Sequence, residues 1–214
     1  MTNQKNKAAR LFLLRHGETV GESSIRYHGR TDVPLSELGR EQMRLAARAI
    51  QSGHGIREFA RVFASPLLRA SEGAKIVAGR AAELVTIDDF AEVHFGLFEG
   101  LTAEEIRGRY PDEFARWNAD RLGEDYTYPA GESRAAFAAR VERGAGEMLR
   151  IWNPRPGRTG DDALLVAHRG VIRAIVRKLI ALEPVVELGS IQILHFDGGW
   201  HPAALDSIEH LDGR

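Results

Sequence analysis

The sequence contains no cysteine, no long hydrophobic run and no excess of charge of either sign. Without cysteine, disulfide bonds, thiol catalysis and cysteine-ligated metal sites are excluded, and we expect a cytoplasmic location. The polar segment 1–10 precedes only a short apolar run, which argues against a signal peptide or a membrane anchor. We predict that residues 1–9 form a flexible tail.

The charges are balanced, with 29 Lys and Arg against 30 Asp and Glu. Such a chain has no overall field that would draw it to nucleic acid or to an anionic membrane, so we expect neither partner. An anionic ligand would have to be held by a local group of cations. The 214 residues are 43% hydrophobic, which is ordinary globular composition and enough for one sizeable core.

Short apolar runs alternate with helical patterns, and no repeat or long linker divides the chain. Buried strands are predicted at 11–14, 62–64, 84–87 and 163–167. Helices are predicted at 36–50, 66–79, 102–110, 137–152 and 171–182, with Leu38 on the inner face of the first. Ser36, Ser65 before Pro66, and Thr102 with Glu105 are the predicted N-caps of the first three. Asp197-Gly198-Gly199 indicates a hairpin between 189–196 and 200–205. We therefore predict one α/β domain over 1–214, a three-layer α/β/α sandwich with a mostly parallel central sheet and an antiparallel edge strand.

Two of the predicted strands end in similar motifs. Arg15-His16-Gly17 follows 11–14, and His168-Arg169-Gly170 follows 163–167. Ligands of open α/β sheets bind beyond the carboxyl ends of the strands, so both imidazoles would face one pocket. One such histidine alone would more commonly be structural, but a matched pair flanked by arginines favours a functional role.

Arg69 and Glu92 are expected at the same edge of the sheet, since each follows a predicted strand. Arg15, Arg69 and the two histidines together would suit a tetrahedral dianion, because guanidinium groups bind phosphate oxygens in pairs. A carboxyl group beside a bound phosphate could act as a general acid, which is the role we expect for Glu92. Taken alone, Glu92 would more commonly be a solvated loop carboxylate.

The ordered blocks of this chain resemble the histidine phosphatase superfamily, which includes the cofactor-dependent phosphoglycerate mutases, over about residues 11–196. The blocks are Arg15-His16-Gly17-Glu18-Thr19, Gly29 with Pro34-Leu35-Ser36, Ser65-Pro66-Leu67 with Arg69, Glu92 with Gly96, Gly131-Glu132-Ser133, and His168 with Gly170. A lone Arg-His-Gly would be a weak signal, whereas several blocks in the right order are a strong one.

The resemblance implies a metal-independent phosphatase without a cofactor, acting on a small phosphorylated substrate. His16 would be the nucleophile and would form a phosphohistidine that water later hydrolyses. Arg15, Arg69 and His168 would hold the phosphoryl oxygens. Glu92 would protonate the leaving oxygen and then deprotonate the attacking water. The residues expected to bind substrate are Arg15, Gly17, Thr19, Glu22, His28, Gly29, Arg69 and Arg169.

Three of these positions depart from the pattern that the family usually shows. Glu22 stands where the family usually has an asparagine that donates to the phosphate, so either the loop turns it outward or the substrate carries its own donors or positive charge. His28 stands where phosphatases often have glutamine, and it would contact substrate or only cap the loop. Arg169 replaces a more common glycine, and it would be either an additional anion clamp or a surface residue of the helix.

Several alternatives stay open. Mutases of the family usually have arginine after the catalytic glutamate, and Val93 in a chain of this length favours a phosphatase instead. A non-catalytic phospho-ligand binder and a metal hydrolase are less favoured, the latter because no helical histidine pair has zinc-site spacing. The aromatic-rich segment 94–132 would form either a lid over the leaving group or a satellite core. The sequence leaves the natural substrate undefined and a homodimer possible.

Overall fold

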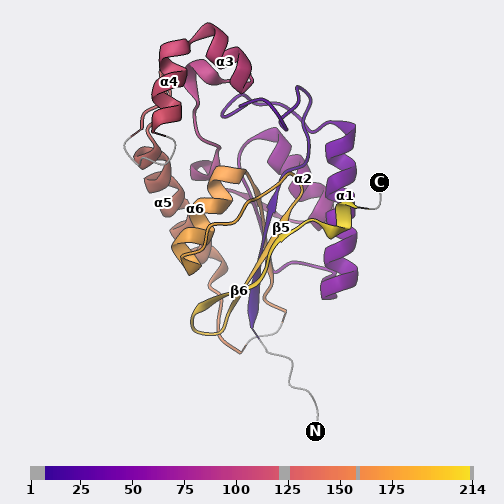
Figure 1. Cartoon of the computed structure of the whole chain (residues 1–214). Helices are drawn as coiled ribbons and strands as arrows, with labels where there is room; N and C mark the ends of the chain where they lie inside the picture. The colour runs from indigo at the N-terminus through magenta and orange to yellow at the C-terminus, as the bar shows by residue number, and fades with distance from the viewer. Residues whose placement is uncertain (1–7, 121–125, 158–159, 213–214) are drawn as a thin grey trace.

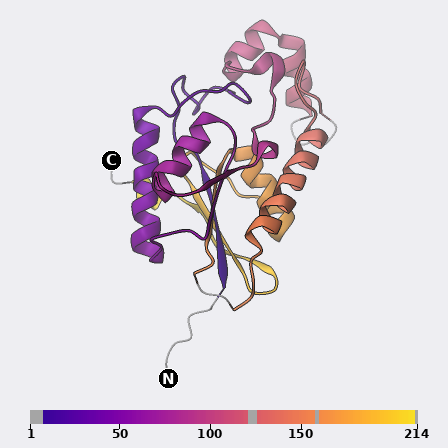
Figure 2. The same ribbon diagram turned by 180° about the vertical axis from the view of Figure 1, so that it is seen from behind.

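The computed structural model describes residues 8–120, 126–157 and 160–212, which form a central sheet between two layers of helices (Figures 1 and 2). Within these residues the sheet has six strands, in the order β3-β2-β4-β1-β5-β6. Their bounds are β1 Ala9–Arg15, β2 Arg61–Ala64, β3 Leu84–Thr86, β4 Ala163–Ala167, β5 Ile191–Phe196 and β6 Trp200–Ser207.

The first four strands pair in parallel, so their carboxyl ends meet at one edge of the sheet. β5 runs antiparallel to β1, and β6 pairs antiparallel with β5 across the predicted turn at Asp197-Gly198-Gly199. The predicted sandwich with a mostly parallel sheet and an antiparallel edge is therefore confirmed. The parallel strands place the ends of β1 and β4, and with them both histidine motifs, next to each other.

Alternate residues of β1 point to the two helical layers, as the period of a strand requires. Phe12 and Leu14 pack with α1 and α2, whereas Leu11 and Leu13 pack with α5 and α6. All four side chains are fully buried, and each contributes about 1.5–3 kcal/mol of hydrophobic stabilisation. The helices are α1 Glu37–His54, α2 Leu68–Ala78, α3 Ala103–Arg109, α4 Pro111–Ala119, α5 Arg134–Trp152 and α6 Arg169–Ile180, with short 3-10 turns η1 Asp88–Phe90, η2 Gly96–Phe98 and η3 Glu209–Leu211.

Most helix starts follow the capping residues that the sequence indicated, with one correction. Ser36 caps α1 by accepting from Gly39 N, and Thr102 with Glu105 forms a capping box at α3. The predicted cap at Ser65-Pro66 is wrong, because α2 begins later, with Leu67 at its N-cap. The Ser65 hydroxyl is instead engaged with an imidazole of the site.

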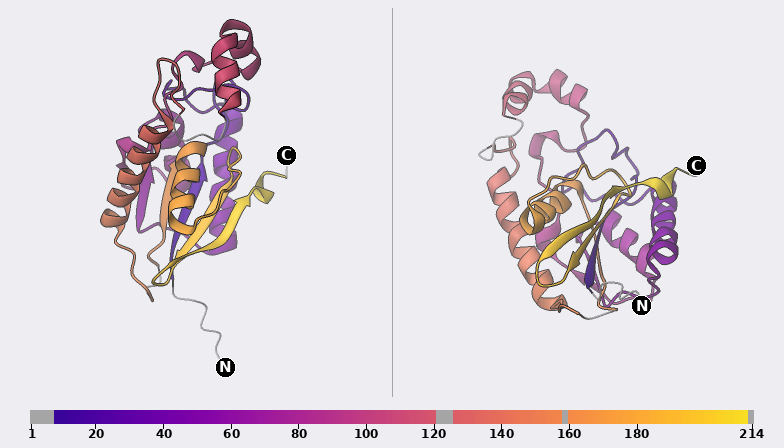
Figure 3. Two further views of the ribbon diagram at one scale, coloured as in Figure 1. Left: turned by 60° about the vertical axis from the view of Figure 1, so that its left-hand side comes forward. Right: turned by 60° about the horizontal axis from the view of Figure 1, so that its bottom comes forward.

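The excursion 94–132 lies at the carboxyl end of the parallel strands, where α3 and α4 stand above the sheet (Figures 1 and 3). The sequence indicated one short helix here and otherwise irregular chain, but Pro111 opens a second helix, α4. The aromatic side chains of the segment pack into a satellite core of their own. Its buried members are Val93, Phe98, Leu101, Ile106, Trp117, Tyr126 and Tyr128. Residues 121–125 lie outside the described part.

Two further predictions, on the N-terminal tail and on the inner face of α1, differ from the structure. The predicted tail 1–9 is too long by its last residue, because Ala9 is buried and paired in β1, while residues 1–7 lie outside the described part. Leu38, expected on the inner face of α1, is 47% exposed, and Met43 is buried on that face. In the described residues no helix is both long and apolar enough to cross a membrane. The cytoplasmic location stays a prediction.

Candidate active site

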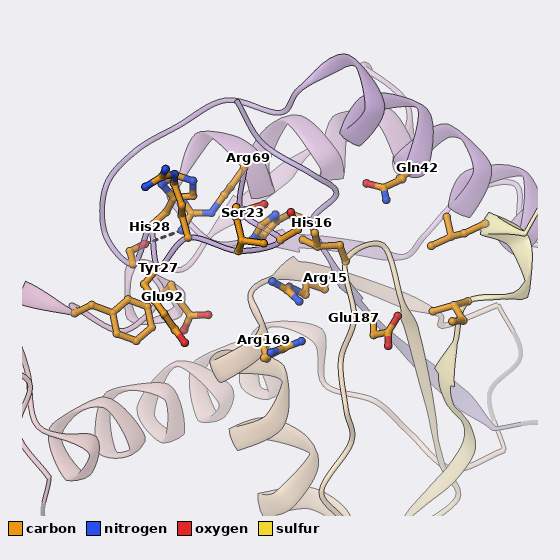
Figure 4. A pocket seen from close by; sticks show the side chains of 18 of the residues that line it. Arg15, His16, Ser23, Tyr27, His28, Gln42, Arg69, Glu92, Arg169 and Glu187 are labelled. Atoms are coloured by element: carbon orange, nitrogen blue, oxygen red, sulfur yellow. Dashed lines mark hydrogen bonds between the residues drawn. The ribbon is translucent and has the colours of Figure 1, made fainter. Parts of the chain in front are cut away.

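A cavity of about 490 Å³ opens at the carboxyl end of β1. Figure 4 shows Arg15, His16, Arg69, Glu92 and Arg169 around this space, which we call the first cavity. These side chains come from β1, α2, α6 and the loop after η1. The topology thus brings together residues that lie far apart in the sequence.

His16 is fixed in one orientation directly after β1. Its backbone N–H donates to the carbonyl of Ala167 at 3.1 Å, and its ring Nδ1 lies 2.7 Å from the carbonyl of Gly17. A carbonyl oxygen can only accept, so Nδ1 carries the proton and, in the neutral ring, Nε2 keeps a lone pair. Burial, reinforced by the charges of Arg69 and Arg15, holds the pKa of His16 well below 6.5. The ring is therefore neutral and has a nucleophilic nitrogen.

Gly17 allows the motif to pass close to the start of α1. A Cβ atom at this position would lie 2.5 Å from the carbonyl oxygen of Gly39, which is backbone and cannot move aside. Gly17 does not line the first cavity, so the absence of a side chain here serves packing rather than ligand contact. The glycine fixes the direction of the loop that leaves His16.

His168 lies against His16, with ring centroids 5.1 Å apart in an edge-on arrangement. Its Nε2 lies 2.7 Å from the hydroxyl of Ser65, and its buried Nδ1 has no hydrogen-bond partner among the described residues. Burial, then the charges of Arg69 and His16, hold the pKa of His168 well below 6.5. A buried ring nitrogen without a hydrogen-bond partner lowers the stability of the fold, and a hydrogen bond to a ligand would remove that cost.

Arg15 and Arg69 are held by neutral backbone carbonyls. Arg69 is 2% exposed and donates to Gly29 O at 2.7 Å and to Thr31 O at 2.9 Å, while Arg15 donates to Val186 O at 3.0 Å. Ion pairs of the described residues include neither arginine. Both guanidinium groups therefore keep their positive charge available to an anionic ligand.

Arg169 shares an anchor with Arg15, because its Nε donates to the same Val186 carbonyl at 3.2 Å. Burial and the nearby charge of Arg169 lower the pKa of Arg15 to about 10, so Arg15 remains cationic at neutral pH. Two like charges on one carbonyl repel each other, and a bound anion would relieve that repulsion. Of the two roles expected for Arg169, its place in the first cavity supports the anion clamp.

Glu92 faces the first cavity from the loop after η1. Its Oε2 accepts from the N–H of Gly170 at 3.1 Å, at the first turn of α6, and its Oε1 accepts from its neighbour Val93 N at 2.9 Å. A Cβ at position 170 would lie 2.5 Å from Glu92 Oε1, so the close approach requires glycine there. The carboxyl group is thereby held beside the cationic cluster.

Arg140 and Glu132 fix the backbone that carries Glu92. Arg140 donates to both carboxylate oxygens of Glu132, at 2.6 and 3.0 Å, and to the carbonyls of Ala91 and Glu92. Burial would raise the pKa of Glu132, but hydrogen bonds from Arg140 and from His94 N lower it overall. The sequence placed Glu132 in a block of unassigned role and did not single out Arg140. Together they position the loop of the candidate acid.

The remaining expected binding residues lie on the loop after Thr19. Gly29 and His28 line the first cavity, and His28 Nε2 lies 2.9 Å from Gly21 O, so the ring also braces its loop. Thr19 is buried behind the site and does not line it. The Glu22 side chain is 66% exposed and pairs with Arg26 at 3.5 Å, outside the cavity lining. Of the two alternatives for Glu22, the structure has the outward one.

A family profile described as histidine phosphatase superfamily, branch 1, matches residues 11–201 of this chain. The chain belongs to this superfamily. The match covers both histidine motifs and the sheet from Leu11 of β1 to the start of β6, so His16, Glu92 and His168 lie within it.

This superfamily member has relatives with several named activities. A protein of Mycobacterium tuberculosis described as bifunctional is 36% identical over 198 residues; the match covers 92% of this chain but 50% of that protein, so the chain spans about half of its length. A glucosyl-3-phosphoglycerate phosphatase of M. tuberculosis is 31% identical, covering 92% of this chain and 89% of the relative. The structure of an α-ribazole phosphatase from Shigella flexneri shares the fold, with a TM-score of 0.77 at 24% identity over 92% of this chain and 96% of that one.

A second cavity of about 670 Å³ adjoins the first, and the two share Glu92, Phe95 and Arg169. Its lining combines side chains of the satellite core with arginines of α6. They are Trp117, Tyr128, Phe137, Arg173 and Arg177, among others. The sequence left two alternatives open for 94–132, a lid or a satellite core. The structure has a satellite core, and its side chains form one wall of the second cavity beside the first.

Proposed function

We propose that this chain is a phosphomonoester hydrolase that acts on a small phosphorylated metabolite through a phosphohistidine at His16. The observation that carries the proposal is the hydrogen bond between His16 Nδ1 and Gly17 O, which leaves Nε2 with a lone pair. The lowered pKa of the ring keeps that lone pair unprotonated. The superfamily membership and the named phosphatase activity of a relative support the same chemistry.

In the first step, His16 Nε2 attacks phosphorus and the bond from phosphorus to the ester oxygen breaks. Glu92 gives its proton to that oxygen, so an alcohol leaves. Arg15 and Arg69 hold the phosphoryl oxygens and stabilise the charge that spreads over them. His168 is the third donor to the phosphoryl oxygens if its unpartnered Nδ1 donates to one of them while the Ser65 hydroxyl donates to its Nε2.

In the second step, Glu92 accepts a proton from water, and the resulting oxygen attacks phosphorus. The bond between phosphorus and Nε2 breaks, which returns neutral His16 and releases inorganic phosphate. In this scheme the guanidinium groups supply the positive charge, so no metal or cofactor takes part. Val93 is buried in the satellite core, and its apolar side chain offers no anchor for the second substrate of a mutase.

The direct test is mass spectrometry of protein mixed with benzyl phosphate in chelator and quenched in base within one turnover. We expect a phosphoryl adduct on His16 in the unchanged chain and none in His16→Ala. His201→Ala is the matched control, because His201 is exposed on the β5–β6 hairpin and should keep the adduct. Hydrolysis that needs an added metal ion, or an adduct on another residue, would disprove the mechanism. Phosphate binding without adduct or release would favour the non-catalytic binder.

A further inference from the structure

The position of Glu92 defines where a leaving group must go. Under the proposed function, the ester oxygen lies within reach of the Glu92 carboxyl while the phosphoryl group lies at His16, Arg15 and Arg69. Glu92 lines both cavities, and Phe95 and Arg169 lie at the same junction. A leaving group that starts at Glu92 therefore continues into the second cavity, whose volume of about 670 Å³ admits a ring-sized group.

The second cavity presents a preorganised aromatic wall. Phe95 packs edge-on against Tyr128, with centroids 5.0 Å apart, and against Tyr27 at 5.3 Å. Phe137 is held by the guanidinium of Arg140, 4.8 Å from its ring centroid. Rings that are already locked by their neighbours lose little entropy when a flat or apolar group packs on them. The wall therefore fits a leaving group with a ring or a similar apolar body.

The charges at the junction add a second requirement. Arg173 and Arg177, which follow Arg169 at spacings of four on α6, both pair with Glu183 at 2.6–2.8 Å. Arg169 has no carboxylate partner among the described residues, and the bond to Val186 uses its Nε. The two terminal nitrogens of Arg169 have no carboxylate partner among the described residues, and together they present one pair of parallel donors. A single planar fork matches a single carboxylate in a bidentate pair.

We propose that the substrate is a monoester whose leaving group carries a carboxylate close to the ester oxygen, bound by Arg169, and a ring-sized body in the second cavity. This inference rests on the proposed function, because it needs the phosphoryl group at His16. The carboxylate must be close to the ester oxygen, since Arg169 and Arg15 share the carbonyl of Val186.

Four substrates separate the two requirements. Ethyl phosphate has neither group, benzyl phosphate has the ring, phosphoglycolate has the carboxylate, and the phosphate ester of mandelic acid has both. We expect kcat/KM to be highest for the mandelate ester, about tenfold or more above benzyl phosphate, as one charge-assisted contact provides. Arg169→Gln should lower that ratio to near one. Lys178→Gln, on the same helix and paired with Glu142, should keep it.

The aromatic wall is tested by Phe95→Leu. This change should lower the ratio of kcat/KM for benzyl phosphate to that for ethyl phosphate. It should leave the ratio of kcat/KM for the mandelate ester to that for benzyl phosphate unchanged. Equal kcat/KM for benzyl phosphate and the mandelate ester, or equal losses for both in Arg169→Gln, would overturn the inference while the proposed function stands. Failure to hydrolyse any of the four, with no adduct at His16, would overturn both.

Discussion

Two arginines of the first cavity and two arginines of the second differ in the groups to which they donate. In the first cavity Arg15 and Arg69 donate to backbone carbonyls, whereas in the second Arg173 and Arg177 pair with the carboxylate of Glu183. An arginine on a neutral carbonyl keeps its charge for a ligand, while an arginine in an ion pair already has its counter-ion. The partners of the arginines, rather than their number, therefore indicate where an anion binds.

Burial sharpens the same contrast. Arg69 and His16, which line the first cavity, and His168, which packs against His16, are at most 4% exposed, so these groups have already lost their hydration. Charges interact more strongly in such surroundings than at a surface, where water and salt screen them. The Arg177–Glu183 pair is exposed and contributes little to stability. Under the proposed function, the first cavity would hold the anionic phosphoryl group and the second would hold what is attached to it.

The largest effect that would separate the two cavities is expected from Glu92→Gln. Glutamine keeps the size of the side chain but cannot give a carboxyl proton to the leaving oxygen. Since kcat/KM covers the steps only up to release of the leaving group, before Glu92 acts as a base, we expect kcat/KM for benzyl phosphate to fall by about 10²–10⁴. We expect kcat/KM for 4-nitrophenyl phosphate to fall far less, because nitrophenolate leaves without a proton. Glu104→Gln, on the exposed face of α3, is the control. Equal losses on both substrates would contradict the role of general acid.

A smaller effect is expected from Asp206→Ala, which acts on the junction between the cavities. Both oxygens of Asp206 accept backbone N–H groups, of Val185 at 2.8 Å and of Val186 at 2.9 Å. Val186 is fully buried at φ 60°, a strained conformation for a β-branched residue, and its carbonyl holds Arg15 and Arg169. Asp206 thus positions both guanidinium groups through Val186.

For Asp206→Ala we expect KM for benzyl phosphate to rise about tenfold with a smaller change in kcat, because phosphate binding loses its aligned arginines. The free energy of unfolding should fall by about 1–3 kcal/mol, since a buried N–H loses its partner. Steady-state kinetics and urea denaturation measure the two effects. Asp206→Asn should recover part of the KM, and Asp197→Ala on the hairpin should change neither. Lost stability with unchanged KM would mean that the contact is structural only.

His16, Arg69 and Glu92 of the first cavity could be predicted from the sequence because each follows a strand, and the carboxyl ends of parallel strands meet at one edge of the sheet. The partners of these residues could not. Ser65 reads locally as a helix cap, and only the pairing of β2 with β4 brings its hydroxyl to His168. Val186 carries no local signal for positive φ, because the contacts of Asp206 impose it from β6.

Glu22 shows the same limit in a single residue. Its place six positions after His16 suggested a contact with phosphate, but the turn at Gly21 and Glu22, both at positive φ, directs the side chain toward Arg26. A helix or strand would have fixed its direction by period alone, whereas in a loop the direction depends on φ and ψ, which the sequence of a loop determines weakly.

The smallest effect is therefore expected from Glu22→Asn. Asparagine adopts positive φ more readily than glutamate, and the exposed pair with Arg26 contributes about 0–1 kcal/mol, so stability should change little. Turnover of benzyl phosphate should stay within about twofold, because the side chain lies outside the first cavity. A tenfold change in rate would require a change of about 1.4 kcal/mol in the activation free energy. Steady-state kinetics on the paired variants Glu22→Asn and Glu22→Gln measure this. A rise of several-fold in Glu22→Asn alone would show that position 22 turns inward when phosphate binds, and that the contrast between the cavities includes this loop.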